Sequence, residues 1–283
     1  MKIFVTGRNG QLGFDVVKEG HFLGYEMHGF SSEELDITDR CQVMNHITTL
    51  KPEVIIHCAA YTAVDQAEDN QERCYEVNVD GTRYLVEAAK LIGAKFVYIS
   101  TDYVFNGQGE EPFTEDDEVN PINYYGLTKL QGEQIVQENL DKFFIVRVSW
   151  VFGINGNNFV KTMLNLAESR VELNVVSDQF GSPTYTVDLA RLLIDMISTE
   201  KFGIYHVSNE GYCSWSMFAE EILRQAQKNV IVHPITTEQY LTKAKRPKNS
   251  RLCKLKLEKN SFQALPSWKD AIGRYLKELA KEV

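Results

Sequence analysis

A glycine-rich turn after the first apolar run constrains the fold of this chain more than any other feature. The run KIFVTG, residues 2–7, leads directly into RNGQLG, so that Gly7, Gly10 and Gly13 recur at three-residue spacing. Between a strand and a helix, such glycines permit a tight turn, the approach of a pyrophosphate, and close helix–strand packing. The first helical turn then offers its N–H groups to phosphate. The pattern predicts a dinucleotide site that includes Gly7, Gly10, Gln11, Leu12 and Gly13.

Short apolar runs alternate with longer helical patterns in the first half of the chain. Runs that are apolar on both faces are typical of parallel strands covered by helices on each side. We expect strands at 2–7, 24–30, 53–60, 95–100 and 143–150, and helices at about 11–20, 68–92 and 124–140. Because strands and helices alternate, we predict an α/β fold with a Rossmann-type doubly wound parallel sheet.

The pattern loosens after about residue 150. Helical periodicity appears at 157–169, at 188–198, at 214–227 with Ser214 as a candidate N-cap, and in the terminal segment SWKDAIGRYLKELAKEV; a further strand is expected at 203–209. No low-complexity linker separates the two halves. We therefore predict a dinucleotide-binding domain at 1–150, to which some later segments return, and a small C-terminal α/β lobe at 151–283 that mainly binds substrate.

Composition and charge exclude several classes of function. The chain of 283 residues carries a net charge of −9, which argues against a nucleic-acid-binding surface. No apolar stretch has the length of a membrane span, and the N-terminal segment MKIFVTG lacks the features of a signal peptide. The five cysteines are scattered without a CxxC pair, and no compact acidic motif assigns a metal. We expect a cytoplasmic protein that binds no nucleic acid, membrane or metal.

The end of the second strand bears on the choice between NADPH and NADH. An acidic residue at this place usually binds the adenosine ribose of NAD, but residues 30–32 are Phe-Ser-Ser, and Glu33 and Glu34 come slightly later. Arg8, inside the glycine loop, is placed to meet a 2′-phosphate, although a solvated arginine is the simpler alternative. This pattern favours NADPH, with NADH tolerated.

Two further segments are placed to contact the cofactor. LDITD puts Asp36 and Ile37 near the adenine end, with a helix cap as the alternative role of Asp36. HCAAYTAVDQAE follows the third strand, and its small residues permit close approach of a cofactor at the carboxyl edge of the sheet. From this segment we predict contacts by Ala59, Ala60, Tyr61 and Thr62.

A hydroxyl residue, a tyrosine and a lysine form a candidate proton-transfer set. Thr101 ends the fourth strand, and Tyr125 and Lys129 lie four residues apart in YGLTK, on one face of a helix. Tyr124 is the competing tyrosine, but only Tyr125 has a lysine at this spacing. An ammonium close to a phenol lowers the phenol pKa from about 10. We therefore predict Tyr125 as the proton donor to a ketone oxygen, assisted by Lys129 and Thr101.

The glycine spacing and the YxxxK motif resemble the extended short-chain dehydrogenases/reductases. Sugar-nucleotide dehydratases of this superfamily carry an acid where this chain has Tyr103, so a base for eliminating water is missing. Eight phrases are similar to the dTDP-4-dehydrorhamnose reductase family and cover nearly the whole chain: GRNGQLG, LDITD, AAYTAVDQAE, STDYVFNG, YGLTKLQGE, VRVSWVFG, DQFGSPT and RPKNSRL. The resemblance implies reduction, by NAD(P)H, of the C4 ketone of dTDP-4-dehydro-L-rhamnose, the last step of dTDP-L-rhamnose synthesis.

The same resemblance implies a set of substrate contacts. Thr101 and Asp102 are expected to line the sugar, and Trp150 to cover it, with a role in the core as the alternative for Trp150. Arg246 is expected at the diphosphate, with a surface loop as its alternative. Further contacts are expected from Val64 and Tyr103. Some members of the family have a magnesium ion at a dimer interface, but no motif in this sequence assigns one. A homodimer is possible, and the sequence does not decide whether it forms.

Two other functions stay open from the sequence. Chains of this shape also serve as non-catalytic, cofactor-binding regulatory subunits, which fits less well because Thr101, Tyr125 and Lys129 are all present. A reductase or epimerase of another nucleotide sugar is the second alternative. An epimerase needs an additional base or a retained cofactor, and we expect His57, inside the third strand, to be structural.

Overall fold

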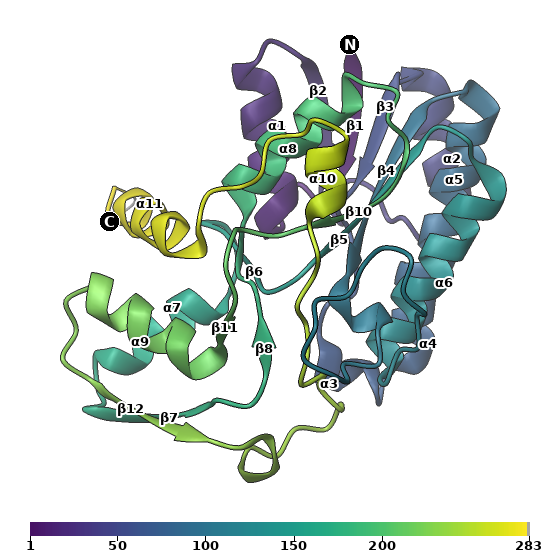
Figure 1. Ribbon diagram of the computed structural model, residues 1–283. Helices are drawn as coiled ribbons and strands as arrows, with labels where there is room; N and C mark the ends of the chain where they lie inside the picture. The colour runs from purple at the N-terminus through teal and green to yellow at the C-terminus, as the bar shows by residue number, and fades with distance from the viewer. Residues whose placement is uncertain (282–283) are drawn as a thin grey trace.

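The computed structural model describes residues 1–281, and within them six parallel strands form one sheet (Figure 1). Their spatial order is β2-β1-β3-β4-β5-β10. The bounds are β1 Lys2–Thr6, β2 Glu26–Phe30, β3 Val54–His57, β4 Lys95–Thr101, β5 Phe143–Val148 and β10 Gly203–Val207. Because β2 and β3 flank β1 on opposite sides, the chain reverses direction across the sheet at β1, where open α/β sheets bind ligands. The predicted doubly wound parallel sheet is confirmed.

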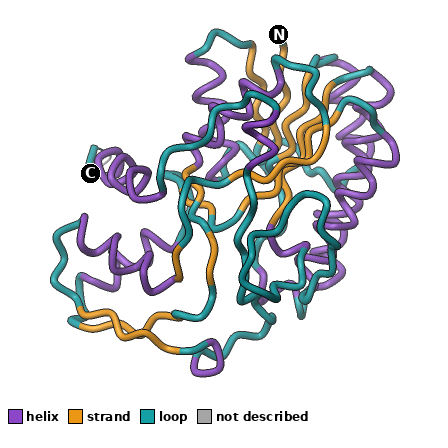
Figure 2. Tube along the Cα trace, in the orientation of Figure 1, coloured by secondary structure: helices purple, strands orange, loops and turns teal. Residues whose placement is uncertain are grey.

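Helices cover both faces of this sheet, as Figure 2 shows for the orange strands between purple helices. One face packs on α1 (Gln11–Phe22) and α8 (Thr186–Ile197). The other packs on α2 (Arg40–Leu50), α5 (Gly81–Ile92) and α6 (Tyr124–Asn139). Side chains alternate between the two cores along each strand: in β1, Ile3 and Val5 join the first core and Phe4 joins the second. All three are fully buried, so both faces are covered as predicted.

A smaller lobe is built from the second half of the chain. It contains α7 (Phe159–Ala167), α9 (Trp215–Gln225), α11 (Trp268–Leu279) and three two-stranded pairs: β7 (Glu172–Val176) with β12 (Ile231–Ile235), β6 (Val151–Phe152) with β9 (Thr184–Tyr185), and β8 (Phe180–Gly181) with β11 (Cys213–Ser214). Ser214 caps α9 as predicted, because its side chain accepts from the Met217 N–H. The lobe has its own core, whereas α8 and β10 return to the main sheet. Residues 282–283 of the predicted terminal helix lie outside the described residues.

Segment 68–92, predicted as one helix, is interrupted. After α3 (Val64–Ala67), the chain forms α4 (Gln71–Tyr75), a π-helical turn at Glu76–Asp80, and then α5. The turn brings Asn78 against the loop after β3, where its side chain accepts from the Tyr61 N–H at 2.8 Å and donates to the Tyr61 carbonyl at 3.2 Å. Single π turns inside helices are frequent at functional sites.

The remaining elements correct two details. The sequence analysis did not predict α2, which begins after Asp39; the carboxylate of Asp39 accepts from the N–H groups of Cys41 and Gln42. Asp36 is therefore not the helix cap. Short elements complete the fold: α10 (Leu255–Lys259) and single 3₁₀ turns at Asp102–Val104 and Thr237–Gln239. Among residues 1–281, no helix has the length and hydropathy needed to cross a membrane.

Candidate active site

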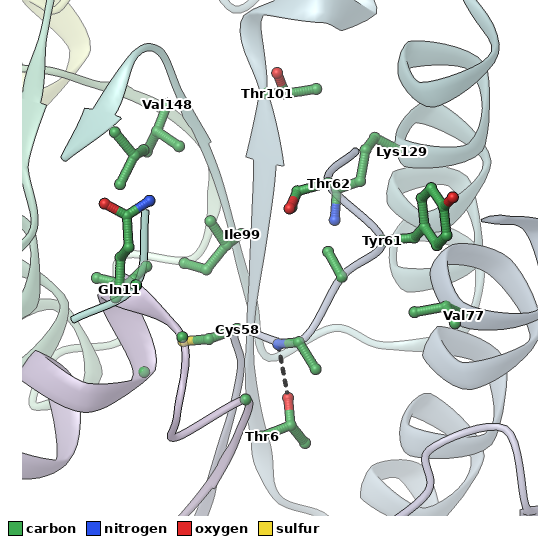
Figure 3. A pocket seen from close by; sticks show the side chains of 18 of the residues that line it. Thr6, Gln11, Cys58, Tyr61, Thr62, Val77, Ile99, Thr101, Lys129 and Val148 are labelled. Carbon is green, nitrogen blue, oxygen red and sulfur yellow. Dashed lines mark hydrogen bonds between the residues drawn. The ribbon is translucent and has the colours of Figure 1, made fainter. Parts of the chain in front are cut away.

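A cavity of about 1020 Å³ lies at the carboxyl edge of the sheet, between the sheet and the smaller lobe. Figure 3 shows Gln11 and Val148 on one side of it and Tyr61, Val77 and Lys129 on the other. Thr6, Cys58, Ile99 and Thr101, from β1, β3 and β4 or directly after them, lie between these sides. The residues that line the cavity range from Thr6 to Arg246 along the sequence. Both halves of the chain therefore contribute to one site.

The glycine loop packs directly against the turn after β3. Gly7 has φ 71°, and a Cβ there would lie 2.8 Å from the Ala59 nitrogen. A Cβ on Gly13 would lie only 2.2 Å from the Gly7 carbonyl oxygen. Residues with side chains would thus displace backbone at both positions, which explains physically why glycine occupies them.

The N-terminus of α1 faces this cavity without a side-chain cap. Its N-cap is Gly10, and within residues 1–281 no side chain caps the helix start; Gln11, Leu12 and Gly13 line the cavity. The Gln11 side chain instead accepts from the Gly153 N–H at 2.9 Å, so it joins the loop to the smaller lobe. A helix start with free donors and a positive dipole end fits an anionic pyrophosphate.

His57 fixes the loop after β3 from below. The Ala59 N–H donates to Thr6 Oγ1 at 3.1 Å, and Thr6 Oγ1 lies within hydrogen-bond distance, 2.8 Å, of His57 Nδ1. The Thr82 hydroxyl donates to the Asn78 carbonyl and accepts from His57 Nε2 at 3.1 Å. Burial lowers the pKa of His57 to about 3, so it is neutral. The expectation that His57 is structural is confirmed.

Two charged residues near the position predicted for the adenosine ribose, after β2, form an ion pair. Arg8 Nη2 lies 2.7 Å from Glu34 Oε1, and the Arg8 guanidinium does not line the large cavity. Asp36 does line it, and its carboxylate accepts from the N–H and the hydroxyl of Thr38 at 2.9 and 2.7 Å. These hydrogen bonds, the hydroxyl first, hold the pKa of Asp36 below its usual value.

Thr101, Asp102 and Tyr125 meet at the end of β4. The Thr101 hydroxyl donates to Asp102 Oδ1 at 3.0 Å and also accepts from the Tyr103 N–H at 3.2 Å. Burial raises the pKa of Asp102 to about 6. Burial, and next the Asp102 carboxylate, raise the pKa of Tyr125, while a hydrogen bond with the Thr101 side chain lowers it by less. The expectation of a lowered Tyr125 pKa is wrong for this arrangement, because burial outweighs the favourable contacts.

Lys129 sits on the same face of α6 as Tyr125 and is buried. Its Nζ lies 4.0 Å from the centroid of the Tyr98 ring. Burial lowers the pKa of Lys129 to about 7, and the Glu133 carboxylate one turn later opposes this shift. Glu133 is itself fully buried, where it accepts from Ser100 Oγ at 2.5 Å and pairs with Arg147 at 2.7 Å. The pKa of Lys129 thus depends in part on a buried network formed by Glu133, Arg147 and Ser100.

Two tryptophans form the wall of the cavity in the smaller lobe. The Trp150 and Trp215 rings stack with centroids 3.7 Å apart. Trp150 has φ 49°, a left-handed conformation that is rare for a bulky residue and often marks a functional position. Gly181 makes room for it, because a Cβ there would lie 2.8 Å from the indole. Trp150 thus lines the cavity and also packs against the core of the smaller lobe.

Arg246 reaches the cavity from the late basic segment. Its Nη2 donates to Asp65 Oδ2 at 2.6 Å, and Asp65 Oδ1 accepts from the Ala244 N–H at 3.1 Å. Arg246 also hydrogen-bonds the Tyr103 side chain, whose pKa burial raises to about 12. Ala244 and Arg246 thus tie the segment to the site, whereas Lys243, Lys245 and Lys248 are exposed.

Comparison with known proteins agrees with this geometry. A family model described as the RmlD substrate binding domain matches residues 1–281. The dTDP-4-dehydrorhamnose reductase of Aggregatibacter actinomycetemcomitans is 42% identical over 285 residues, which cover 96% of this chain and 97% of that protein. The chain belongs to the dTDP-4-dehydrorhamnose reductase family.

Two solved structures named for this family share its architecture. The protein from Clostridium acetobutylicum is 45% identical, with a TM-score of 0.97 over 99% of this chain and 100% of that one. The protein from Bacillus anthracis, determined in complex with NADP, is 46% identical, with a TM-score of 0.96 over 98% of this chain and 100% of that one. The likeness therefore spans both the sheet and the smaller lobe.

The structure brings together nearly all residues that the family resemblance and the motifs singled out. Arg8 is the exception; the lining includes Gly7, Gly10, Gln11, Leu12, Gly13, Asp36, Ile37, Ala59, Ala60, Tyr61, Thr62, Val64, Thr101, Asp102, Tyr103, Tyr125, Lys129, Trp150 and Arg246. Their individual roles stay predictions. Sequence reasoning missed Trp215, Asn158 and Arg73 in the lining, because no local motif sets them apart from ordinary helix residues. Among the described residues, no cluster of three or more His, Cys, Asp or Glu is arranged to hold a metal.

Proposed function

We propose that this chain reduces the C4 ketone of dTDP-4-dehydro-L-rhamnose to the alcohol with NADPH, giving dTDP-L-rhamnose. The observation that carries the proposal is one shared cavity: Thr101, Tyr125 and Lys129 line it together with the glycine loop. The family membership supplies the substrate class. The relative determined with NADP supports the cofactor.

The bound cofactor would supply a hydride to C4. The carbonyl oxygen then gains negative charge, and Tyr125 donates its phenolic proton to that oxygen. The raised pKa of Tyr125 keeps it protonated at neutral pH, as a donor requires. Thr101 exchanges its hydrogen bond to Asp102 for one to the same oxygen. Lys129 holds positive charge beside the developing phenolate, and general acid catalysis of this kind contributes on the order of 10²–10⁴-fold.

The other lining residues divide between the two ligands. We assign the sugar to Asp102, Val64, Tyr103 and Trp150, all of which line the cavity. Arg246 would bind the substrate diphosphate, since guanidinium groups bind phosphate oxygens well. It would either break its hydrogen bond to Asp65 or contact Asp65 and the diphosphate together. These contacts orient the ketone toward Tyr125.

The test is oxidation of NADPH in the presence of dTDP-4-dehydro-L-rhamnose, followed by the absorbance of the reduced nicotinamide. We expect turnover by the wild-type chain and a fall in kcat of about 10²–10⁴-fold for Tyr125→Phe. Tyr124→Phe is the matched control, because Tyr124 is adjacent but does not line the cavity. No turnover by a folded wild type that binds NADPH would reject the substrate assignment.

Among the described residues, no histidine or cysteine at this site offers the additional base that an epimerase needs. His57 lines no part of the cavity and has both ring nitrogens engaged. Cys58 does line it, but burial raises the pKa of its thiol to about 12, so it stays protonated. A purely regulatory role is equally poorly supported, because an intact proton-transfer set has no use in it.

A further inference from the structure

A second cavity borders the glycine loop and shares Phe30 with the active-site cavity. It has a volume of about 530 Å³, and Arg8 and Glu34 both line it. The Arg8 N–H donates to the Phe30 carbonyl at 3.1 Å, which joins the loop to the last residue of β2. The guanidinium then extends past Gly29, whose carbonyl accepts from Nη1 at 3.4 Å. Arg8 thus lies beside the end of β2 rather than over the active site.

The Glu34 carboxylate bridges two donors at this place. One oxygen, Oε1, pairs with Arg8 Nη2 at 2.7 Å, and the other, Oε2, accepts from the Ser31 N–H at 2.8 Å. Both side chains of the ion pair are more than two-fifths exposed, so the pair can open at small cost. A guanidinium, a backbone N–H and nearby serine hydroxyls form the donor set that binds phosphate monoesters well.

The donor set lies where the adenosine ribose of a dinucleotide is expected. Ser31 and Ser32 line the active-site cavity directly after β2, the strand whose end contacts that ribose in this fold. A 2′-phosphate at this point would approach the two donors that Glu34 now uses. A carboxylate and a phosphate cannot share them without repulsion, because both carry negative charge.

We propose that Glu34 is a specificity-determining residue for the cofactor: its carboxylate occupies the donor set that a 2′-phosphate requires, and it is displaced when NADP(H) binds. Glu34 thereby reduces the preference for NADP(H) over NAD(H) that Arg8 and the serines create. NAD(H), which has only a hydroxyl at this position, leaves the Arg8–Glu34 pair intact. This inference rests on dinucleotide binding from the proposed function, but not on the identity of the sugar.

The test is binding of NADP⁺ and NAD⁺ to the full chain by titration calorimetry, without sugar nucleotide. Glu34→Gln keeps the size and a hydrogen-bond acceptor but removes the charge. We expect the ratio of the NAD⁺ Kd to the NADP⁺ Kd to rise about two- to fivefold. Glu33→Gln is the matched control, since it removes the same charge one residue away, and we expect an unchanged ratio.

Two further measurements sharpen this test. Adenosine 2′,5′-bisphosphate and AMP carry only the adenosine end, and they are expected to reproduce the change in the ratio. In an Arg8→Met background, Glu34→Gln is expected to have a smaller effect, because one shared donor is gone. An unchanged ratio, or weaker NADP⁺ binding in Glu34→Gln, would overturn the inference. If neither dinucleotide binds the folded wild type, the cofactor assignment fails instead.

Discussion

The two ends of the active-site cavity are built in different ways. The cofactor end consists of turns that directly follow β1, β2 and β3, and its key positions are backbone: the glycine loop, the start of α1 and the N–H of Ala59. The sugar end gathers side chains from distant segments, including Trp150, Trp215 and Arg246. Under the proposed function, a dinucleotide would be held mainly by chain geometry, whereas the sugar would be held by side chains that packing brings together from distant segments.

Arginine–carboxylate pairs occur at both ends and show the same division. Arg8 and Glu34 come from the turns after neighbouring strands, and their pair competes for an expected ligand phosphate. Arg246 and Asp65 are separated by 181 residues, and their pair also anchors the late segment to the site. A change at the first pair should alter one ligand contact, whereas a change at the second should also alter the fold of the site.

The largest expected effect is at the cofactor end. Gly13→Ala would place a Cβ 2.2 Å from the Gly7 carbonyl oxygen, so the loop must shift away from the start of α1. Misplacement of groups by about 1 Å can lower a catalytic rate by about 10²-fold. We expect a shift of the loop to raise the NADP⁺ Kd by a similar factor, about 10²-fold. Gly273→Ala in α11 is the control, because its Cβ would meet only the end of the Gln225 side chain. An unchanged Kd in Gly13→Ala would show that this loop does not hold the dinucleotide by its geometry.

The same comparison explains what the sequence could predict. Five of the six strands in the main sheet, the glycine loop and the Tyr125–Lys129 face follow from local periodicity and spacing, and β10 was expected as a strand, although its place beside β5 was not specified. The π turn was not predictable, because its cause is the contact of Asn78 with Tyr61, 17 residues away. Trp215 was missed for a similar reason: on α9 it is one apolar residue among several, and only tertiary packing places it against Trp150.

The candidate site was predicted unevenly for the same physical reason. Spacing identified which residues meet, but not the balance of burial and charge at Tyr125, since burial depends on the complete cavity. The sequence analysis also placed Arg8 near a 2′-phosphate but did not predict its ion pair with Glu34, because no local pattern indicates that Glu34 folds back onto the glycine loop. The sequence therefore identified residues of the site, but only the structure gave their ion pairs and the direction of their pKa shifts.

Two buried histidines in the main sheet predict how the stability of the chain depends on pH. Burial lowers the pKa of His57, under the cofactor end, and of His206, in β10, to about 3. Because the unfolded chain binds protons on them near pH 6.5 and the folded chain does not, the free energy of unfolding falls as pH decreases from 6.5 toward 3. Each histidine should cost about 2 kcal/mol between pH 7 and 5.

Urea unfolding of His57→Gln and His206→Gln at both pH values checks this expectation. Each variant should lose about 2 kcal/mol less than the wild type over the same interval. Asp15 and Asp102 act in the opposite direction, because burial raises the pKa of each to about 6 and protonation below that value favours the folded chain. The difference between variant and wild type removes their contribution. Identical pH dependence in all three proteins would contradict the assignment of neutral buried histidines.

At the sugar end, Trp215→Ala separates the two ligands. It removes the ring stacked on Trp150, and stacked aromatic pairs contribute about 0.5–1.5 kcal/mol beyond their buried area. We expect the KM for the sugar nucleotide to rise up to about tenfold, with the NADP⁺ Kd nearly unchanged. Met217→Ala, an exposed position on the same helix, is the control. Equal weakening of both ligands would mean that the two ends of the cavity are not independent.

The smallest expected effect tests the junction between the two ends. Asn123 caps α6 by accepting from the Gly126 N–H at 2.8 Å, and its amide donates to the Lys245 carbonyl at 2.9 Å, next to Arg246. Asn123→Asp keeps the acceptor for the cap and replaces the donor to the Lys245 carbonyl with a carboxylate oxygen, so we expect the free energy of unfolding to fall by about 1 kcal/mol. Asn123→Ala loses both hydrogen bonds and should cost about 1 kcal/mol more. Urea unfolding gives these values, and equal losses in the two variants would assign the whole effect to the long-range contact with Lys245, leaving the local cap without a measurable role.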